Sequence, residues 1–220
     1  MKIYLDCLPC LMNQALKAAR AATDDEAIQR DVLNATAAMM PDLPPGLKPP
    51  EMAQHIYRLV DQITGNHDPY RKAKAEANEA VLALYPHLKR LIADSPDPLL
   101  TACKLAIGGN SIDLGPNFEQ VDVSYLVESS LSSPLCINDY EKLRSSLSSS
   151  RQILYLGDNA GEIVFDRLLI EELQRARKTD VYFVVRGGPV VNDATLDDAV
   201  AVGLDKVATV VPNGSDAPAR

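Results

Sequence analysis

The 220-residue sequence lacks an apolar run long enough for a membrane span, and no charged-then-apolar leader opens it. It also lacks an excess of basic residues, since 22 Lys and Arg stand against 30 Asp and Glu for a net charge of −8. Basic side chains supply most non-specific affinity for nucleic acid. We therefore expect a cytoplasmic protein that binds neither membranes nor nucleic acid. A small phosphorylated substrate remains compatible with this charge, because a bound divalent cation can reverse the local field.

Cysteine and histidine are scarce, and their spacing indicates no complete metal site. Four cysteines in a chain of this length do not resemble a secreted disulfide framework. Cys7 and Cys10 form a CxxC at the start of a predicted helix, which is compatible with packing, with half of a zinc site or with a redox pair. A zinc site would need two more ligands, and the sequence has no second CxxC. His55, His67 and His87 lack HxH or HxxxH spacing, which favours packed or solvated histidines.

Three well-known phosphate motifs are also missing. The sequence has no GxxxxGK[ST], no GxGxxG and no DxD pair after a predicted strand. These absences disfavour a P-loop, a dinucleotide fold and a route through an aspartyl phosphate.

The composition is that of an ordinary soluble globular protein, with 46% apolar and 24% charged residues. The length allows one large domain or two small ones.

The first part of the chain is predicted to be helical, and the last part alternates strands with helices. Helices are expected at residues 9–21, 26–40, 51–64, 68–84, 88–92, 99–107 and 138–149. Proline-rich residues 41–50 cannot continue a helix and predict a loop, and Pro86 is expected to kink or divide the fourth helix. We therefore predict an α/β protein with a helical region at 1–137 and an α/β domain with parallel strands at 138–220.

Three predicted strands each deliver Asn and Asp at or just past their carboxyl ends. The strands are expected at 153–156, 181–185 and 207–211, and the polar pairs are Asp158 with Asn159, Asn192 with Asp193, and Asn213 with Asp216. The carboxyl ends of parallel strands form the ligand-binding edge of a sheet. Carboxylate and amide oxygens suit Mg²⁺ or Mn²⁺. Asp158 and Asn159 alone could merely cap the following helix, but the repetition after three strands favours a site.

A metal at Asp158, Asn159 and Asp193 would act as a Lewis acid, orient a phosphate and lower the pKa of bound water. The backbone near Gly161, at the start of the next predicted helix, could hold phosphate oxygens. Phosphate ester hydrolysis is the chemistry that this set of groups favours.

Two charged residues beside this set have open roles. Arg186, after the second strand, could clamp the transferring phosphoryl group or be a solvated charge. Glu162 could be a general base, an outer partner of the metal or a first-turn helix charge.

Five segments together resemble the metal-dependent damage-control phosphatases, in their stand-alone prokaryotic branch. They are residues 7–10 (CLPC), 109–113 (GNSID), 157–162 (GDNAGE), 186–195 (RGGPVVNDAT) and 213–216 (NGSD). The resemblance implies a Rossmann-like α/β/α domain and hydrolysis of small phosphorylated metabolites, including sugar phosphates. It implies Mn²⁺, Co²⁺, Ni²⁺ or Mg²⁺ on Asp158, Asn159 and Asp193. The resemblance also implies that Asn110 and Asp113 lie near the site. Together with the roles considered above, we predict Asp158, Glu162 and Arg186 as catalytic residues, and Asn110, Asp113, Gly161, Arg186, Asn192 and Asn213 as substrate contacts.

The resemblance also implies a difference at the carboxyl end. Members of the family are expected to continue into a further helix, a strand and a Lys-Gly-Gln-Gly-Asn motif near the phosphate, whereas this sequence ends at Arg220. We therefore expect a truncated phosphate-side wall. The alternative function is a non-catalytic metal or metabolite binder, or an inactive fragment of such an enzyme.

Overall fold

The computed structural model describes residues 4–44, 46–111 and 123–215, which form two compact units. The helical unit takes in the described parts of Met1–Lys72, Gly187–Val191 and Gly214–Arg220. The sheet unit takes in those of Ala73–Arg186 and Asn192–Asn213. The predicted division at 137/138 separated the mainly helical part of the sequence from the part that alternates strands and helices. The two units are instead defined by which residues pack together, and several helices before residue 137 pack with the sheet.

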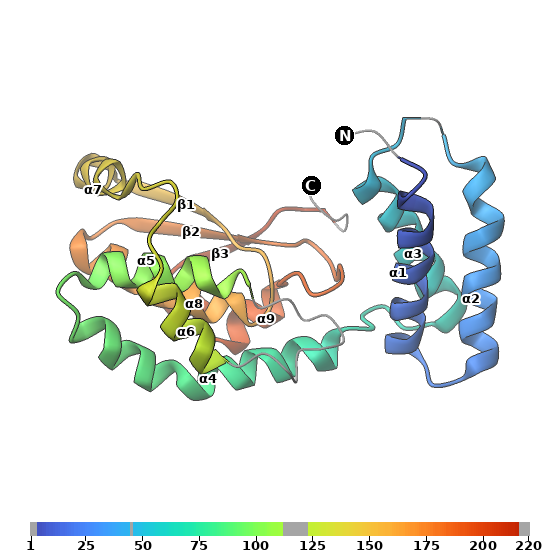
Figure 1. The fold of residues 1–220 in the computed structure, drawn as a ribbon, viewed down its shortest axis with the longest axis horizontal. Helices are drawn as coiled ribbons and strands as arrows, with labels where there is room; N and C mark the ends of the chain where they lie inside the picture. Colours follow the sequence, from blue (N-terminus) through green and yellow to red (C-terminus); the bar gives the residue numbers. More distant parts are fainter. Residues whose placement is uncertain (1–3, 45, 112–122, 216–220) are drawn as a thin grey trace. The chain divides into compact units, whose positions relative to one another are not determined.

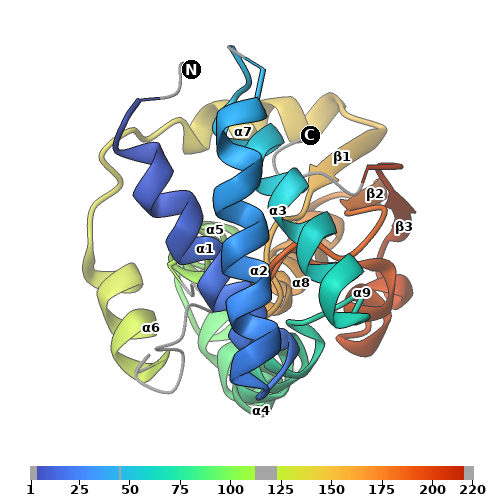
Figure 2. The same cartoon turned by 90° about the vertical axis from the view of Figure 1, so that its right-hand side faces the viewer.

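Three helices make up most of the helical unit: α1 (Cys7–Ala22), α2 (Glu26–Met39) and α3 (Pro49–Thr64). Figure 2 shows them side by side. Their shared core consists of Leu11, Ala15, Ala18, Ala19, Val32, Met52, Ile56 and Val60. Asp25 caps α2 by accepting a hydrogen bond from the Ala27 N–H at 2.8 Å, and Gly65 ends α3 at φ +69°. A short 3₁₀ turn, η1 (Met40–Asp42), follows α2 where the proline-rich loop begins.

The sheet unit contains a three-stranded parallel sheet and the helices that pack on it (Figure 1). Its helices are α4 (Arg71–Ala93), α5 (Pro98–Gly109), α6 (Val123–Ser132), α7 (Tyr140–Ser149), α8 (Glu162–Ala176), α9 (Leu196–Ala201) and the 3₁₀ turn η3 (Leu204–Lys206). The strands β1 (Gln152–Leu156), β2 (Asp180–Val185) and β3 (Thr209–Pro212) lie in that order. Leu154 pairs with Tyr182, and Tyr182 with Thr209. The α/β class with parallel strands is therefore confirmed.

Helix α8, which connects β1 to β2, is the centre of the core of this unit. Ile163, Val164, Phe165 and Ile170 are all 0% exposed. They belong to one apolar cluster with side chains from α4, α5, α6, α9 and the sheet. Because α8 is surrounded by apolar partners, its first turn is held at a definite position beside the carboxyl end of β1.

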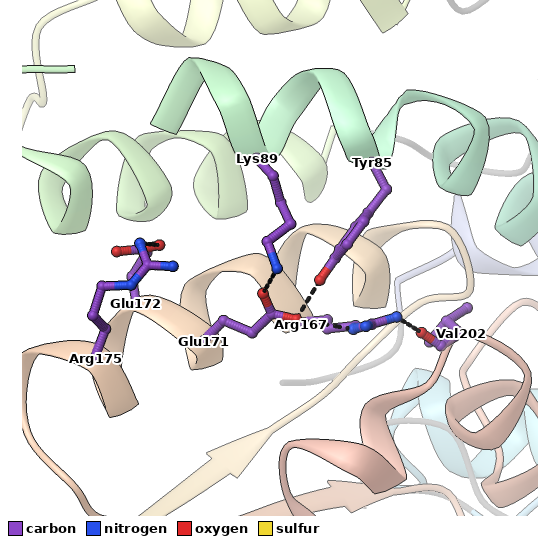
Figure 3. A network of polar contacts seen from close by, with 7 residues as sticks. All are labelled: Tyr85, Lys89, Arg167, Glu171, Glu172, Arg175 and Val202. Atoms are coloured by element: carbon purple, nitrogen blue, oxygen red, sulfur yellow. Dashed lines mark hydrogen bonds and ion pairs between the residues drawn. The ribbon is translucent and has the colours of Figure 1, made fainter. Parts of the chain in front are cut away.

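Polar contacts also tie α8 to α4 and to the residue that follows α9 (Figure 3). The Glu171 carboxylate accepts hydrogen bonds from Tyr85 Oη and from Arg167 Nε at 3.2 Å, and it pairs with Lys89 Nζ at 2.6 Å. Arg167 Nη1 donates to the Val202 carbonyl at 2.7 Å. One carboxylate on α8 thus collects three donors, two of them from α4.

Two local predictions differ from the structure, and two helices lack a prediction. Helix α4 runs unbroken through Pro86, because fully buried side chains on both sides of it, such as Val81 and Leu88, hold the helix together. The third strand begins at Thr209 instead of residue 207. Helices α6 and α9 are not predicted from periodicity.

None of the helices within 4–44, 46–111 and 123–215 is long and apolar enough to cross a membrane.

Candidate active site

The turn after β1 is shaped by a glycine packed against an aromatic ring. A Cβ on Gly157 would lie 2.3 Å from Cζ of the buried Phe183, so a larger residue would require that ring to move. The Gly157 N–H donates to the Val184 carbonyl at 3.0 Å, which keeps the turn on β2. Asp158 follows with an exposed side chain and Asn159 with a half-buried one. The turn therefore presents these two side chains at the carboxyl end of the sheet.

The loop after β2 joins this turn through the backbone. Asn159 and Asp193 form an isolated antiparallel bridge. The Ala194 N–H donates to the Asp158 carbonyl at 2.7 Å, and the Ala160 N–H donates to the Asn192 carbonyl at 2.9 Å. The structure thus brings together four of the predicted site residues, Asp158, Asn159, Asn192 and Asp193.

Arg186 belongs to the same cluster, where it is paired rather than solvated. Its Nε donates to Oδ2 of Asp193, and the two side chains are only 15% and 14% exposed. Burial raises the pKa of the Asp193 carboxyl, and the charge of Asp158 adds to the rise, while Arg186 and Lys74 oppose it. The carboxylates of Asp158 and Asp193 therefore lie close enough to repel one another.

Glu162, in the first turn of α8, bridges two amides. Its Oε1 accepts from Asn110 Nδ2 at 2.9 Å, and its Oε2 accepts from Asn159 Nδ2 at 3.3 Å. Glu162 is 6% exposed, and burial raises the pKa of its carboxyl, although the hydrogen bonds from both amides oppose the rise. Asn110, the residue directly after α5, is thereby placed beside the site. Because Asn159 directs its amide nitrogen at carboxylates, its Oδ1 is the atom that remains for a cation.

The other residues predicted for the site are placed by hydrogen bonds of their backbone N–H groups, or lie outside the described residues. The Gly161 N–H donates to Oδ1 of Asn78 at 2.7 Å, so it holds α4 and is not free to bind phosphate. The Asn213 N–H donates to the Val185 carbonyl at 2.9 Å, which places Asn213 at the end of β3. Asp113 and Asp216 lie outside the described residues.

Sequence reasoning missed two polar residues of α4 that reach this region. They are Asn78, which binds the Gly161 N–H, and Lys74. Lys74 is 1% exposed and pairs with Asp198 Oδ2 at 3.1 Å. Asp198 also accepts from the N–H and Oγ1 of Thr195, at 2.9 and 2.7 Å. Lys74 and Asn78 lie at helical spacing from the buried Ala77 and Val81, and this spacing could have indicated that they face the core. The helix is rich in Ala, Lys and Glu, however, so that both residues resembled surface residues.

The donor set fits a hard divalent cation only if an amide takes part. Within the described part of the chain, no three His, Cys, Asp or Glu side chains form a group that could hold a metal. The predicted set has two carboxylates, on Asp158 and Asp193, and needs the amide oxygen of Asn159 as its third ligand. Oxygen donors of this kind suit Mg²⁺ and Mn²⁺, and the mutual repulsion of the carboxylates is what a cation would relieve.

The CxxC motif belongs to the helical unit, whereas Asp158, Asn159 and Asp193 belong to the sheet unit. Cys7 is half-buried at the start of α1 and its Sγ accepts from the Tyr4 N–H at 3.4 Å, while Cys10 is exposed. Both thiols are free. Packing, zinc and redox roles all stay open for this pair.

Comparison with known proteins agrees with the motifs. Residues 3–219 match the model of the damage-control phosphatase ARMT1-like domain. A damage-control phosphatase of Archaeoglobus fulgidus is 34% identical, over 99% of this chain and 76% of its own length. An uncharacterized protein of Methanocaldococcus jannaschii is also 34% identical, over 98% of this chain and 72% of its own length.

A solved structure shows the same fold. The crystal structure of a DUF89 family protein from Pyrococcus horikoshii superposes with a TM-score of 0.85 at 31% identity, covering 99% of this chain and 75% of that one. The protein of that organism is also found by sequence as a damage-control phosphatase, 31% identical over 98% of this chain. The resemblance stated from the motifs is thereby confirmed, and the chain belongs to the damage-control phosphatase ARMT1-like family.

Proposed function

We propose that this chain is a metal-dependent phosphatase that hydrolyses phosphate monoesters of small metabolites. The observation that carries the proposal is the antiparallel bridge between Asn159 and Asp193, which gathers oxygen ligands from two strand ends beside the first turn of α8. The names of the relatives from Archaeoglobus fulgidus and Pyrococcus horikoshii support the same reaction class.

Asp158, Asn159 and Asp193 would hold the cation, which we propose to be Mn²⁺, Co²⁺, Ni²⁺ or Mg²⁺. When bound, such an ion polarises a phosphate oxygen and lowers the pKa of a coordinated water. Without a cation, the carboxylates of this site would repel a phosphate dianion. The proposed reaction therefore requires the metal ion.

The protein's own groups have positioning roles around that set. Glu162 orients Asn159 through its Oε2 and is the candidate general base or outer partner of the metal. Arg186 holds Asp193 in place and keeps a positive charge at the edge where a phosphate would bind. Asn78 fixes the Gly161 backbone, which sets the position of the first turn of α8. The helix dipole of α8 favours a negative group at that end.

The test is hydrolysis of p-nitrophenyl phosphate after EDTA treatment, with each of the four cations added back. We expect activity only with added metal, and a loss of at least about 100-fold in kcat/KM for Asp158→Asn. Asp205→Asn, which removes an exposed carboxylate in η3, is the matched control and should keep full activity.

Full activity in EDTA would overturn the metal dependence. Metal binding without turnover of any phosphate ester would instead establish the alternative function, a non-catalytic metal binder.

A further inference from the structure

A cavity of about 600 Å³ lies beside Glu162 in the sheet unit. Its walls come from α5, α7, α8, the end of β1 and the segment before α7. A volume of this size falls within the range of small-molecule sites, about 300–1,000 Å³. The cavity therefore has room for a whole metabolite or for a large part of one.

The walls carry several solvent-exposed apolar side chains. Ile107, Ile137, Leu143 and Leu156 all line the cavity and are 58%, 85%, 40% and 70% exposed. Exposed apolar side chains gathered in one concave surface are typical of ligand-binding grooves. Covering such surface favours binding, because it removes apolar area from water.

The polar side chains in the lining are already bonded to protein partners. Asn110 donates to Glu162, Tyr155 Oη donates to Asp166 Oδ1 at 2.6 Å, and Tyr140 Oη donates to Asp97 Oδ1 at 2.6 Å. The Asp139 carboxylate pairs with Lys142 Nζ at 2.8 Å, and burial raises the pKa of the Cys103 thiol to about 11, so that this thiol stays neutral. A ligand rich in hydroxyl groups would have to compete with these pairs for hydrogen bonds or leave some of its own groups unbonded, which weakens its binding.

Glu162 connects the cavity with the candidate metal site. One of its oxygens bonds to Asn110 in the cavity wall, and the other bonds to Asn159 in the predicted ligand set. A phosphate ester held by a cation at Asp158 and Asn159 would therefore lie next to Glu162, and so beside the wall of the cavity.

We propose that the cavity binds the organic group of the substrate, and that the preferred substrates are phosphate monoesters of apolar alcohols, aryl or medium-chain alkyl, over sugar phosphates. This rests on the proposed phosphatase function. The preference follows from walls that offer apolar surface while their polar atoms are occupied.

The kinetic test compares kcat/KM for 1-naphthyl phosphate and hexyl phosphate with glycerol phosphate and glucose 6-phosphate. We expect the two apolar esters to be favoured by at least about tenfold. The double variant Ile107→Ser/Leu143→Ser should lose about tenfold on the apolar esters while glycerol phosphate changes less than twofold. Leu154→Ser is the matched control, because Leu154 is 69% exposed but does not line the cavity.

A second measurement separates this inference from the phosphatase proposal. Fluorescence titration with 1-naphthol, in EDTA and with no phosphate present, reports the cavity alone. Weaker binding in the double variant but not in Leu154→Ser supports the cavity even if the protein hydrolyses nothing. If sugar phosphates are preferred, or if 1-naphthol binds both variants as it binds the original protein, the inference is overturned while the phosphatase proposal can still stand.

Discussion

Asn159 and Asp193 face each other across an isolated antiparallel bridge, although they follow two different parallel strands. The bridge brings the loop after β2 back against the turn after β1. As a result Asp193, held by Arg186, lies near enough to Asp158 for the two charges to interact. Removing any one of these contacts should change how the site binds a cation.

The first prediction concerns metal binding. Asp193→Asn should abolish measurable Mn²⁺ binding, because a hard-oxygen site derives its affinity from charge and Asp193 is one of only two carboxylates in the set. The double variant Cys7→Ser/Cys10→Ser should leave Mn²⁺ affinity within about twofold, since thiolates prefer softer metals. Titration calorimetry measures both. Loss of Mn²⁺ binding in a folded cysteine variant would move the site into the helical unit.

The second prediction concerns the buried ion pair of Lys74. Lys74→Met should leave the Asp198 carboxylate without its buried partner and lower the free energy of unfolding by about 3–5 kcal/mol. Adding Asp198→Asn to that variant should restore part of the loss. Urea unfolding measures both effects, and Lys178→Met, on an exposed lysine, should change stability by less than about 0.5 kcal/mol. Equal losses in both lysine variants would contradict a special role for Lys74.

The third prediction is a decrease of stability with rising pH that originates at Asp166. Burial raises the pKa of Asp166 from 3.8 to about 8 in the folded protein, against the hydrogen bond from Tyr155. Between these values the folded chain keeps a proton that the unfolded chain has lost. The contribution of Asp166 is therefore complete below about pH 3.8 and disappears as pH rises towards 8. The slope in this window is at most about 1.4 kcal/mol per pH unit.

Asp166→Asn cannot titrate, so it should flatten this slope and raise the melting temperature more at pH 8 than at pH 5. Thermal unfolding in EDTA at both pH values decides the matter, because EDTA removes any effect of bound cations. A pH profile parallel to that of the original protein would show that Asp166 ionises normally.

The fourth prediction has the opposite sign and concerns Glu171 (Figure 3). Burial alone would raise the pKa of Glu171, but the hydrogen bonds and charges of Lys89, Tyr85 and Arg167 outweigh it and hold the pKa below its ordinary value of 4.5. The stabilisation is therefore present above that ordinary value and is lost as pH falls through the folded pKa. Glu171→Gln should cost about 1–3 kcal/mol at pH 7 and less in acid.

Urea unfolding at pH 7 and at pH 4 tests this expectation. Glu79→Gln, which removes an exposed carboxylate from α4, serves as its control and should be nearly neutral at both pH values. A cost for Glu171→Gln that stays constant with pH would mean that packing, and not charge, makes the residue important.

Much of the sheet unit could be predicted from local patterns. The apolar runs after Arg151 and Thr179 predicted β1 and β2 to within a residue, because short runs of β-branched, aromatic and other apolar residues favour strands. The polar residues after each strand predicted the edge that would carry oxygen ligands. Five motifs in order were enough to indicate the family.

The pairing of distant residues required the tertiary structure. No local pattern shows that Lys74 would pair with Asp198, that Asn78 would take the N–H of Gly161, or that Arg186 would be paired and only 15% exposed. Likewise, α4 continues through Pro86 because of its packing. Sequence by itself determined the strands and the kinds of polar side chains at their carboxyl ends, since these depend on short-range periodicity and side-chain chemistry. Only the tertiary structure decided which charges are buried and with what partners, because burial depends on every element packed around them.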